Sequence, residues 1–233
     1  MVQLLSEILE GPVERPLFGR CVVVRPTVET ARANRHPSQA VVVTTAARRL
    51  IELSKAGEKL AAVLVEGAKD PTTHPEFHEI SENLRELMNK WYPKGKLTLL
   101  AHAAELTKPE ARHALSFYDV PIIELTAGTQ KTLAKLSDQP IEHHKTLVED
   151  LRKIESEKLV VRSSFYRGTV DNSKDTEVRT WLRNLDGIRP AKIQIGTPAK
   201  ADGGLKPITK TRIEEIASTV QEKTGVPVEI ETP

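Results

Sequence analysis

Cysteine is the scarcest of the residues that could carry out chemistry in this sequence. Cys21 is the single cysteine among 233 residues, and it lies in GRCVVVRP, directly before a β-branched run. One thiol cannot form a disulfide within the chain, and it cannot hold a cluster or zinc ion that needs several cysteines. No base adjoins it in the sequence, so the pattern predicts a small buried residue at the start of a strand rather than a nucleophile.

Polar side chains in or just after apolar runs are the second group that could act on a ligand. They are Lys69, Asp70, Thr72, His102, Thr126, Ser163 and Gln194. Parallel strands of α/β proteins place their carboxyl ends around one pocket, so these residues predict a ligand pocket. If the protein is an enzyme, Asp70, His102 and Thr126 would be its acid–base or polar groups, with His102 as the general base. Turn and cap chemistry is the alternative at Asp70 and Thr72, and structural pairing is the alternative on the later strands.

Two histidines have the spacing of paired zinc ligands. His74 and His78 are four residues apart, and His102 would be the third ligand if both lay on one helix face. The alternative is that His74 caps the helix and that His78 is solvated. We favour this second interpretation and predict no metal site.

Arginines cluster near the N-terminus. Seven of them lie between Gly11 and Leu50, where only Glu14 and Glu29 oppose them: Arg15, Arg20, Arg25, Arg32, Arg35, Arg48 and Arg49. The net charge of +2 is too small to indicate nucleic-acid binding by itself. A solvated face is the ordinary explanation of such a cluster, and an anion-binding or RNA-binding site is the alternative.

The composition is typical of a soluble globular protein, with 39% hydrophobic and 28% charged residues. No apolar run approaches the roughly 18 residues needed to span a bilayer. The N-terminal MVQLLSEILE has no basic region, so it predicts a short amphipathic helix rather than a signal peptide. One cysteine and no export signal predict a cytoplasmic protein. The sequence contains no Walker loop and no GxGxxG or GxSxG motif.

The elements that position these residues alternate between strands and helices. Strands are predicted at residues 21–25, 60–65, 96–102, 120–126, 158–166, 191–196 and 226–230. Helices are predicted at residues 44–56, 75–91, 108–118, 142–157, 175–185 and 209–223. Pro75 and Pro109 fit the first turn of a helix, Gly225 fits a helix end, and GTVDNSKDTE predicts an Asp or Asn cap. The alternation predicts a mostly parallel sheet that closes fully or partly into a barrel.

Several segments resemble the radical SAM family, and they occur in the same order. KDPTTHPEF is similar to the family's GEPTLHPEF-type segment, and GPVERPLFGR is similar to the GPVPSRRLGRS opening of one subgroup. The match continues through ENLRELMNKWYPKGKLTLL, DVPIIELTAGTQKTLAKL, RGTVDNSKDTEVRTWLRNLDGIRPAKIQI and GLKPITKTRIEEIASTVQEKTGVPVEI. The resemblance covers nearly the whole chain.

The resemblance implies a single domain over residues 1–233, with a partial (βα)6-type TIM-like barrel and an N-terminal extension at residues 1–20. In the family, a CxxxCxxC loop after the first strand holds a [4Fe–4S] cluster, and S-adenosylmethionine ligates the fourth iron. The equivalent loop here is residues 26–39, PTVETARANRHPSQ, and it contains no cysteine. We therefore expect no [4Fe–4S] cluster and no other cofactor, and we do not expect S-adenosylmethionine to bind.

Other working positions of the family also differ. The Gly-Glu-Pro segment that contacts the methionine amino group is Lys69-Asp70-Pro71 here, and a Thr-Asn-Gly-type turn is Ala101-His102-Ala103. A Leu-Asp-Ala-Gly segment has become Leu125-Thr126-Ala127-Gly128. The scaffold segments are kept while the chemical ends of the strands are altered, which is what a retired active site on a retained fold would look like.

The sequence thus predicts a non-catalytic protein with a radical SAM-like fold that has a binding or accessory role. Its partner would be a protein, an RNA or a ribonucleoprotein particle, contacted through the arginine-rich segment from Arg15 to Arg49. One alternative is a non-radical enzyme or small-ligand binder that uses the residual pocket at the barrel mouth. Another is that a partner subunit supplies the cluster. None of these hypotheses involves a membrane.

Overall fold

The chain folds as two compact units, which are described separately below. The structure is a computed structural model. It describes residues 7–28, 36–67, 69–102, 104–136, 143–154 and 157–231. The units are Met1–Ile122 and Ile123–Pro233, so the chain passes from one to the other within strand β5 (Val120–Glu124).

The first unit is a mostly parallel sheet with helices. Its elements in chain order are β1 (Leu9–Arg15), β2 (Gly19–Val24), α2 (Gln39–Lys55), β3 (Ala62–Val65), the 3-10 helix η1 (Pro71–Thr73), α3 (Phe77–Trp91), β4 (Lys96–Ala101), α4 (Pro109–Ala114), the 3-10 helix η2 (Leu115–Phe117) and the start of β5. The strands follow the order β1-β2-β3-β4-β5. Strands β2, β3 and β4 are parallel, and β1 runs antiparallel to β2.

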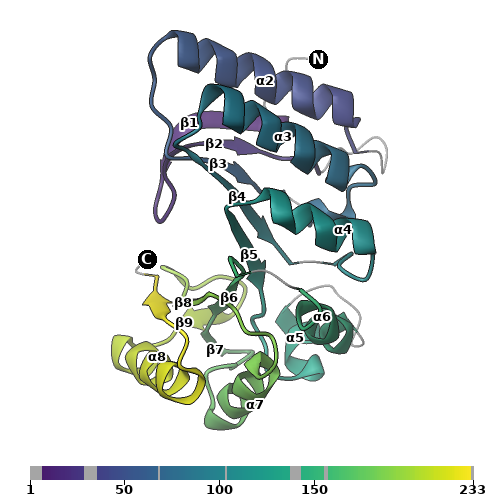
Figure 1. Cartoon of the computed structure of the whole chain (residues 1–233). Helices are drawn as coiled ribbons and strands as arrows, with labels where there is room; N and C mark the ends of the chain where they lie inside the picture. Colours follow the sequence, from purple (N-terminus) through teal and green to yellow (C-terminus); the bar gives the residue numbers. More distant parts are fainter. Residues whose placement is uncertain are drawn as a thin grey trace. The chain divides into compact units, whose positions relative to one another are not determined.

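The central strands β2 and β3 of the first unit are buried on both faces. Cys21, Val23, Ala62 and Leu64 form a cluster on one face. The alternate residues of β2 and β3 point to the other face, where α2 and α3 lie along the sheet (Figure 1). Burial on both faces is typical of parallel sheets and explains the near-continuous apolar runs of these strands.

The second unit repeats this architecture with a shorter sheet. Its elements in chain order are the end of β5, α5 (Gln130–Leu136), α6 (His143–Leu151), β6 (Val160–Ser164), β7 (Tyr166–Gly168), α7 (Asp175–Leu185), β8 (Lys192–Gly196), β9 (Leu205–Pro207), α8 (Lys210–Thr224) and β10 (Val228–Ile230). Strands β6, β8 and β10 are parallel neighbours in that order. Strands β7 and β9 form a separate antiparallel ribbon. In the core, the indole of Trp181 meets the ring of Phe165 edge to face, with 5.3 Å between centroids.

Most of the predicted framework is confirmed. All seven predicted strands are present, and the fold class is mostly parallel α/β. Pro109 lies in the first turn of α4, and Gly225 ends α8 in the left-handed region with φ of 68°. Helix α3 begins at Phe77 rather than at Pro75, because Glu76 is its N-cap.

Three details of the sequence prediction are wrong. The N-terminal helix does not extend through Glu10, because Leu9 and Glu10 pair with Val24 and Val23 in an antiparallel ladder; residues 1–6 lie outside the described residues. Helix α7 has Lys174 as its N-cap and no side-chain cap. Elements β7, β9 and α5 were not predicted, because each is short and has little periodicity. No helix in the described part of the chain is long and apolar enough to cross a membrane.

Candidate functional site

Asp70 follows β3, and its carboxylate is engaged by the backbone of the first unit. Its Oδ1 accepts hydrogen bonds from the backbone N–H of Thr72 at 2.8 Å and from the Thr72 hydroxyl at 2.7 Å, which caps η1. Its Oδ2 accepts from the backbone N–H of Ala104 at 3.0 Å, in the turn after β4. The side chain is buried. Both carboxylate oxygens therefore support local structure, as the turn-and-cap alternative predicts.

The segment that replaces the cluster loop is anchored where it begins. Thr27 is buried, and its hydroxyl donates to the carbonyl oxygen of Lys69. A Cβ on Gly67 would lie 2.0 Å from the Thr27 hydroxyl oxygen, so only glycine allows this close approach. The Lys69 side chain itself is exposed. The part of residues 26–39 nearest β2 is thus packed against the chain that follows β3.

His74 anchors the same segment where it ends. Its Nδ1 accepts the backbone N–H of Glu76 at 3.0 Å, so the ring proton is on Nε2, which donates to the carbonyl oxygen of Pro37 at 2.7 Å. The ring of His36 lies 5.5 Å from that of His74, and burial lowers the pKa of His36. Because both nitrogens of His74 are engaged, it is not free to bind zinc. Within the described ranges, no group of three or more His, Cys, Asp or Glu side chains could hold a metal ion.

The arginines at the ends of β1 and β2 are paired with carboxylates. Arg25, directly after β2, lies 3.1 Å from Glu66, directly after β3. It also contacts Glu10 on β1, whose other neighbour is Arg15 at 3.3 Å. The hydrogen bond from Arg25 lowers the pKa of Glu10. These four side chains form an ion-pair cluster at the carboxyl ends of β2 and β3.

The remaining arginines of the predicted contact surface divide into two groups. Arg20 lies 2.9 Å from Glu58, and Arg49 donates to the carbonyl oxygen of Gly11 at 3.1 Å. Arg48 is exposed on α2, whereas Arg32 and Arg35 lie outside the described residues. Sequence reasoning missed the pairs because the partners Glu10, Glu58 and Glu66 lie outside the window in which the arginines were counted.

The segment after β5 is held by hydrogen bonds from β6, α6 and α7 of the second unit. The carbonyl oxygen of Leu125 accepts from the Ser163 hydroxyl at 2.6 Å and from the indole N–H of Trp181 at 2.9 Å. The carbonyl oxygen of Ala127 accepts from Nε2 of the buried His144 at 2.9 Å, and burial lowers the pKa of that histidine. A Cβ on Gly128 would lie 2.3 Å from the carbonyl oxygen of Glu177, so only glycine allows this close approach.

A polar row crosses the opposite face of the second unit's strands. Arg162 on β6 is the register partner of Gln194 on β8, and Gln194 is the register partner of Glu229 on β10. Arg162 lies 2.6 Å from Glu231 and 3.6 Å from Glu124, so structural pairing occurs on these strands. Since successive residues of a strand alternate between faces, Ser163 and Gln194 point to opposite sides and do not line one pocket.

Gln194 contributes one hydrogen bond to this row and leaves one atom unused. Its Nε2 donates to Glu229 at 3.1 Å, and this bond lowers the pKa of Glu229. Its buried Oε1, together with Nε of Arg162 and the second carboxylate oxygen of Glu231, has no hydrogen-bond partner among the residues that the structure describes. Buried polar atoms of this kind normally have a hydrogen-bond partner, so these three atoms could still form hydrogen bonds.

Asn172 joins the carboxyl ends of β5 and β6 to the start of β7, a role that was not recognised from the sequence. Its Nδ2 donates to the carbonyl oxygens of Thr126 at 2.7 Å and Ser164 at 2.8 Å, and its Oδ1 accepts from the N–H of Tyr166 at 2.7 Å. The residue is almost fully buried. The side chain predicted to cap a helix instead closes the sheet edge near Thr126.

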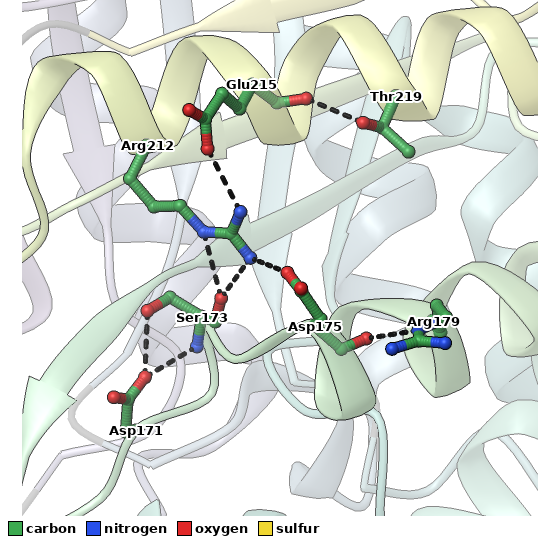
Figure 2. A network of polar contacts seen from close by, with 7 residues as sticks. All are labelled: Asp171, Ser173, Asp175, Arg179, Arg212, Glu215 and Thr219. Atoms are coloured by element: carbon green, nitrogen blue, oxygen red, sulfur yellow. Dashed lines mark hydrogen bonds and ion pairs between the residues drawn. The ribbon is translucent and has the colours of Figure 1, made fainter.

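Arg212 on α8 holds the loop that carries Asn172. Figure 2 shows its guanidinium between the carbonyl oxygen of Ser173, at 2.6 Å, and the carboxylates of Asp175 and Glu215. Asp171 accepts hydrogen bonds from the N–H and hydroxyl of Ser173. This network fixes the start of α7, so several hydrogen bonds hold the loop after β7 in place within the second unit.

The donor set of the chain does not fit the cluster of the resembled family. A [4Fe–4S] cluster held by CxxxCxxC needs three thiolates, and the chain has one cysteine. Cys21 is fully buried in β2, where burial raises the pKa of its thiol. His102 directly follows β4 and is exposed. Among the described residues, the carboxyl ends of β2, β3 and β4 therefore present ion pairs and caps, and no group there could hold a metal ion.

Comparison with known proteins identifies the fold by structure and not by sequence. No family model and no curated protein matches the sequence. A radical SAM methyltransferase from Sphaerobacter thermophilus is similar with a TM-score of 0.64 and 13% identity, over 91% of this chain and 65% of that one. SuiB from Streptococcus suis, solved with its precursor peptide SuiA, is similar with a TM-score of 0.63 and 13% identity, over 99% of this chain and 52% of that one.

A third solved enzyme leads to the same assignment. Coproporphyrinogen III oxidase (HemN) from Escherichia coli, a radical SAM enzyme, is similar with a TM-score of 0.55 and 10% identity, over 96% of this chain and 56% of that one. The chain spans 65%, 52% and 56% of the length of these three enzymes. The chain therefore has the radical SAM fold, and it lacks the three cysteines with which a CxxxCxxC loop holds the cluster.

Proposed function

We propose that this protein is a non-catalytic, cytoplasmic binding or accessory protein built on a radical SAM fold. The observation that carries the proposal is the engagement of Asp70, whose two carboxylate oxygens accept three hydrogen bonds from Thr72 and Ala104. In the resembled family this segment contacts the methionine amino group. Here the carboxylate is committed to the turn after β4, and the exposed Lys69 beside it would repel an ammonium group.

The ion-pair cluster of Arg25, Glu66, Glu10 and Arg15 supports the same proposal. It occupies the carboxyl ends of β2 and β3, next to the segment that replaces the cluster loop. Charged groups in such a cluster stabilise one another, and removing one member leaves a partly buried charge unpaired. If this edge of the sheet carried a catalytic group, at least one of these four side chains would have to be free of its ion pair.

RNA, alone or in a ribonucleoprotein, is the partner class that we propose. The support is the excess of arginine between Gly11 and Leu50, of which Arg48 is exposed and Arg32 and Arg35 belong to the replaced loop. Contacts to phosphate release counterions, so RNA affinity should fall as salt rises.

The test is a fluorescence titration of labelled oligouridylate at about 50 and 200 mM potassium chloride, in which the salt dependence reports phosphate contacts. We expect salt-dependent binding by the wild-type chain and weaker binding by Arg32→Glu/Arg35→Glu. A Lys59→Glu/Lys94→Glu variant, which changes two exposed cations of the same unit, controls for net charge. Equal affinity of the Arg32→Glu/Arg35→Glu variant and wild type would remove the arginine segment as the contact.

A small-ligand binder is the second candidate, and the polar row of the second unit favours it. The unused Oε1 of Gln194 and Nε of Arg162 offer one acceptor and one donor on the same face. A ligand with a complementary donor and acceptor would use both atoms. A thermal-shift screen of small polar metabolites, compared between wild type and Gln194→Leu, tests this candidate. A hit that stabilises both proteins equally would count against it.

A further inference from the structure

The β7–β9 ribbon places two cations directly opposite each other. Arg167 on β7 is the register partner of Lys206 on β9, and both side chains are exposed. Neither makes a side-chain hydrogen bond or ion pair with any other residue that the structure describes. Like charges at directly opposed positions of an antiparallel pair repel each other, so this arrangement weakens the ribbon instead of stabilising it.

The two strands of the ribbon are nevertheless held together at one end by hydrogen bonds and packed closely at the other. The Thr197 hydroxyl donates to the carbonyl oxygen of Phe165 at 2.9 Å and accepts the N–H of Ile208 at 3.0 Å, which joins the bases of the two strands. A Cβ on Gly168 would lie 2.2 Å from the carbonyl oxygen of Gly204, so the two strands approach closely at the other end. A rigid ribbon that holds two unpaired cations side by side suits an anionic partner better than a structural role.

The position of the ribbon also fits a binding surface. Strand β7 follows the carboxyl end of β6, and β9 belongs to the connection that leaves the carboxyl end of β8, as Figure 1 shows. The carboxyl edge is where α/β proteins bind their ligands. Lys200 adds a third exposed cation in the same connection, and Asp202 is the one acid there.

We infer that the β7–β9 ribbon binds the phosphate backbone of RNA, with Arg167 and Lys206 as the phosphate contacts. Directly opposed residues of an antiparallel pair have Cβ atoms about 5 Å apart, so two cations at such positions can neutralise neighbouring phosphates of one strand. Successive residues of a strand point to opposite faces, so Tyr166 lies on the other face of the ribbon and the phosphate contacts alone carry the inference. The inference rests on the proposed RNA-binding function and names a surface in the second unit for it.

The test compares the salt dependence of oligouridylate binding by wild type, Arg167→Gln/Lys206→Gln and the control Arg179→Gln/Lys223→Gln. The control removes one exposed arginine and one exposed lysine from α7 and α8. Each lost contact to a single strand should reduce the magnitude of the slope of log K against log salt by about 0.7, so the ribbon variant should lose about 1.4 and the control none. Thermal unfolding should show no loss of stability in the ribbon variant, because the substitution removes a repulsion.

The outcomes separate this inference from the proposed function. If wild type binds oligouridylate and the ribbon variant keeps its affinity and slope, the ribbon assignment is overturned and RNA binding stands. If wild type does not bind oligouridylate, both the ribbon assignment and the proposed RNA binding are overturned. Whether the chain can hold an iron–sulfur cluster is a separate question, which iron reconstitution tests. Tighter binding to a DNA duplex than to oligouridylate would overturn the assignment to RNA. Destabilisation of the ribbon variant would instead assign the two cations a structural role.

Discussion

The hydroxyl and backbone N–H of Thr72 both donate to the same carboxylate oxygen of Asp70, at 2.7 and 2.8 Å. The other oxygen is bound by the N–H of Ala104. A residue that the family resemblance suggests for ligand binding is therefore a structural cap. Arg25, Asn172 and His74 also make structural contacts.

Replacement of Asp70 should destabilise the first unit. Asp70→Ala leaves the N–H groups of Thr72 and Ala104 without their acceptor, and we expect a loss of about 1–3 kcal/mol in the free energy of unfolding. Asp70→Glu, which restores the longer acid of the family, should also be less stable than wild type. Urea unfolding of the full chain measures both. An Asp70→Ala variant as stable as wild type would show that the cap contributes nothing.

The ion pair between Arg25 and Glu66 should be energetically coupled. Their side chains are 21% and 22% exposed, whereas Arg20 and Glu58 are 41% exposed at a similar separation. A double-mutant cycle with Arg25→Gln and Glu66→Gln should give about 1 kcal/mol, and the cycle at Arg20 and Glu58 only a few tenths. Equal coupling in the two cycles would contradict the view that the ion-pair cluster at the end of β2 stabilises this edge of the sheet.

Asn172 should be a large single contributor to the stability of the second unit. Asn172→Ala removes hydrogen bonds to Thr126, Ser164 and Tyr166 and leaves buried backbone groups unpaired, so we expect a cost of about 2–4 kcal/mol. Asp171→Ala, which removes only local bonds to Ser173, serves as the neighbouring control and should cost under about 1 kcal/mol. The midpoints of urea unfolding should separate the two variants clearly. A similar loss in both would be inconsistent with a strand-joining role for Asn172.

The buried His144 should make stability depend on pH. Burial lowers its pKa in the folded protein below the usual 6.5, so the unfolded chain binds more protons as the pH falls through that value. Stability should therefore decrease between about pH 7.5 and pH 5.5, and His144→Gln should show a smaller decrease than wild type. His36, whose pKa is also lowered, contributes in the same direction, so His36→Gln is the parallel comparison. Identical pH profiles for wild type and His144→Gln would refute this role.

The sequence predicted the framework well because periodicity reports burial. The apolar run at Cys21–Val24 and the periodic helix at Asp175–Leu185 are both observed where they were expected. Contacts between distant segments could not be predicted in the same way. Arg25 meets Glu66 only because β2 and β3 are parallel neighbours. The short ribbon strands β7 and β9 lack periodicity, so nothing in the sequence indicated that Arg167 faces Lys206.

The most direct test of the central claim is anaerobic reconstitution of the purified chain with iron and sulfide, followed by incubation with S-adenosylmethionine and a strong reductant. A chain with one buried cysteine should retain no stoichiometric iron, show no visible absorbance from a cluster and release no 5′-deoxyadenosine. A matched run with a radical SAM enzyme that has all three cysteines shows that the procedure works. Incorporation of four irons per chain together with cleavage of S-adenosylmethionine would contradict the account.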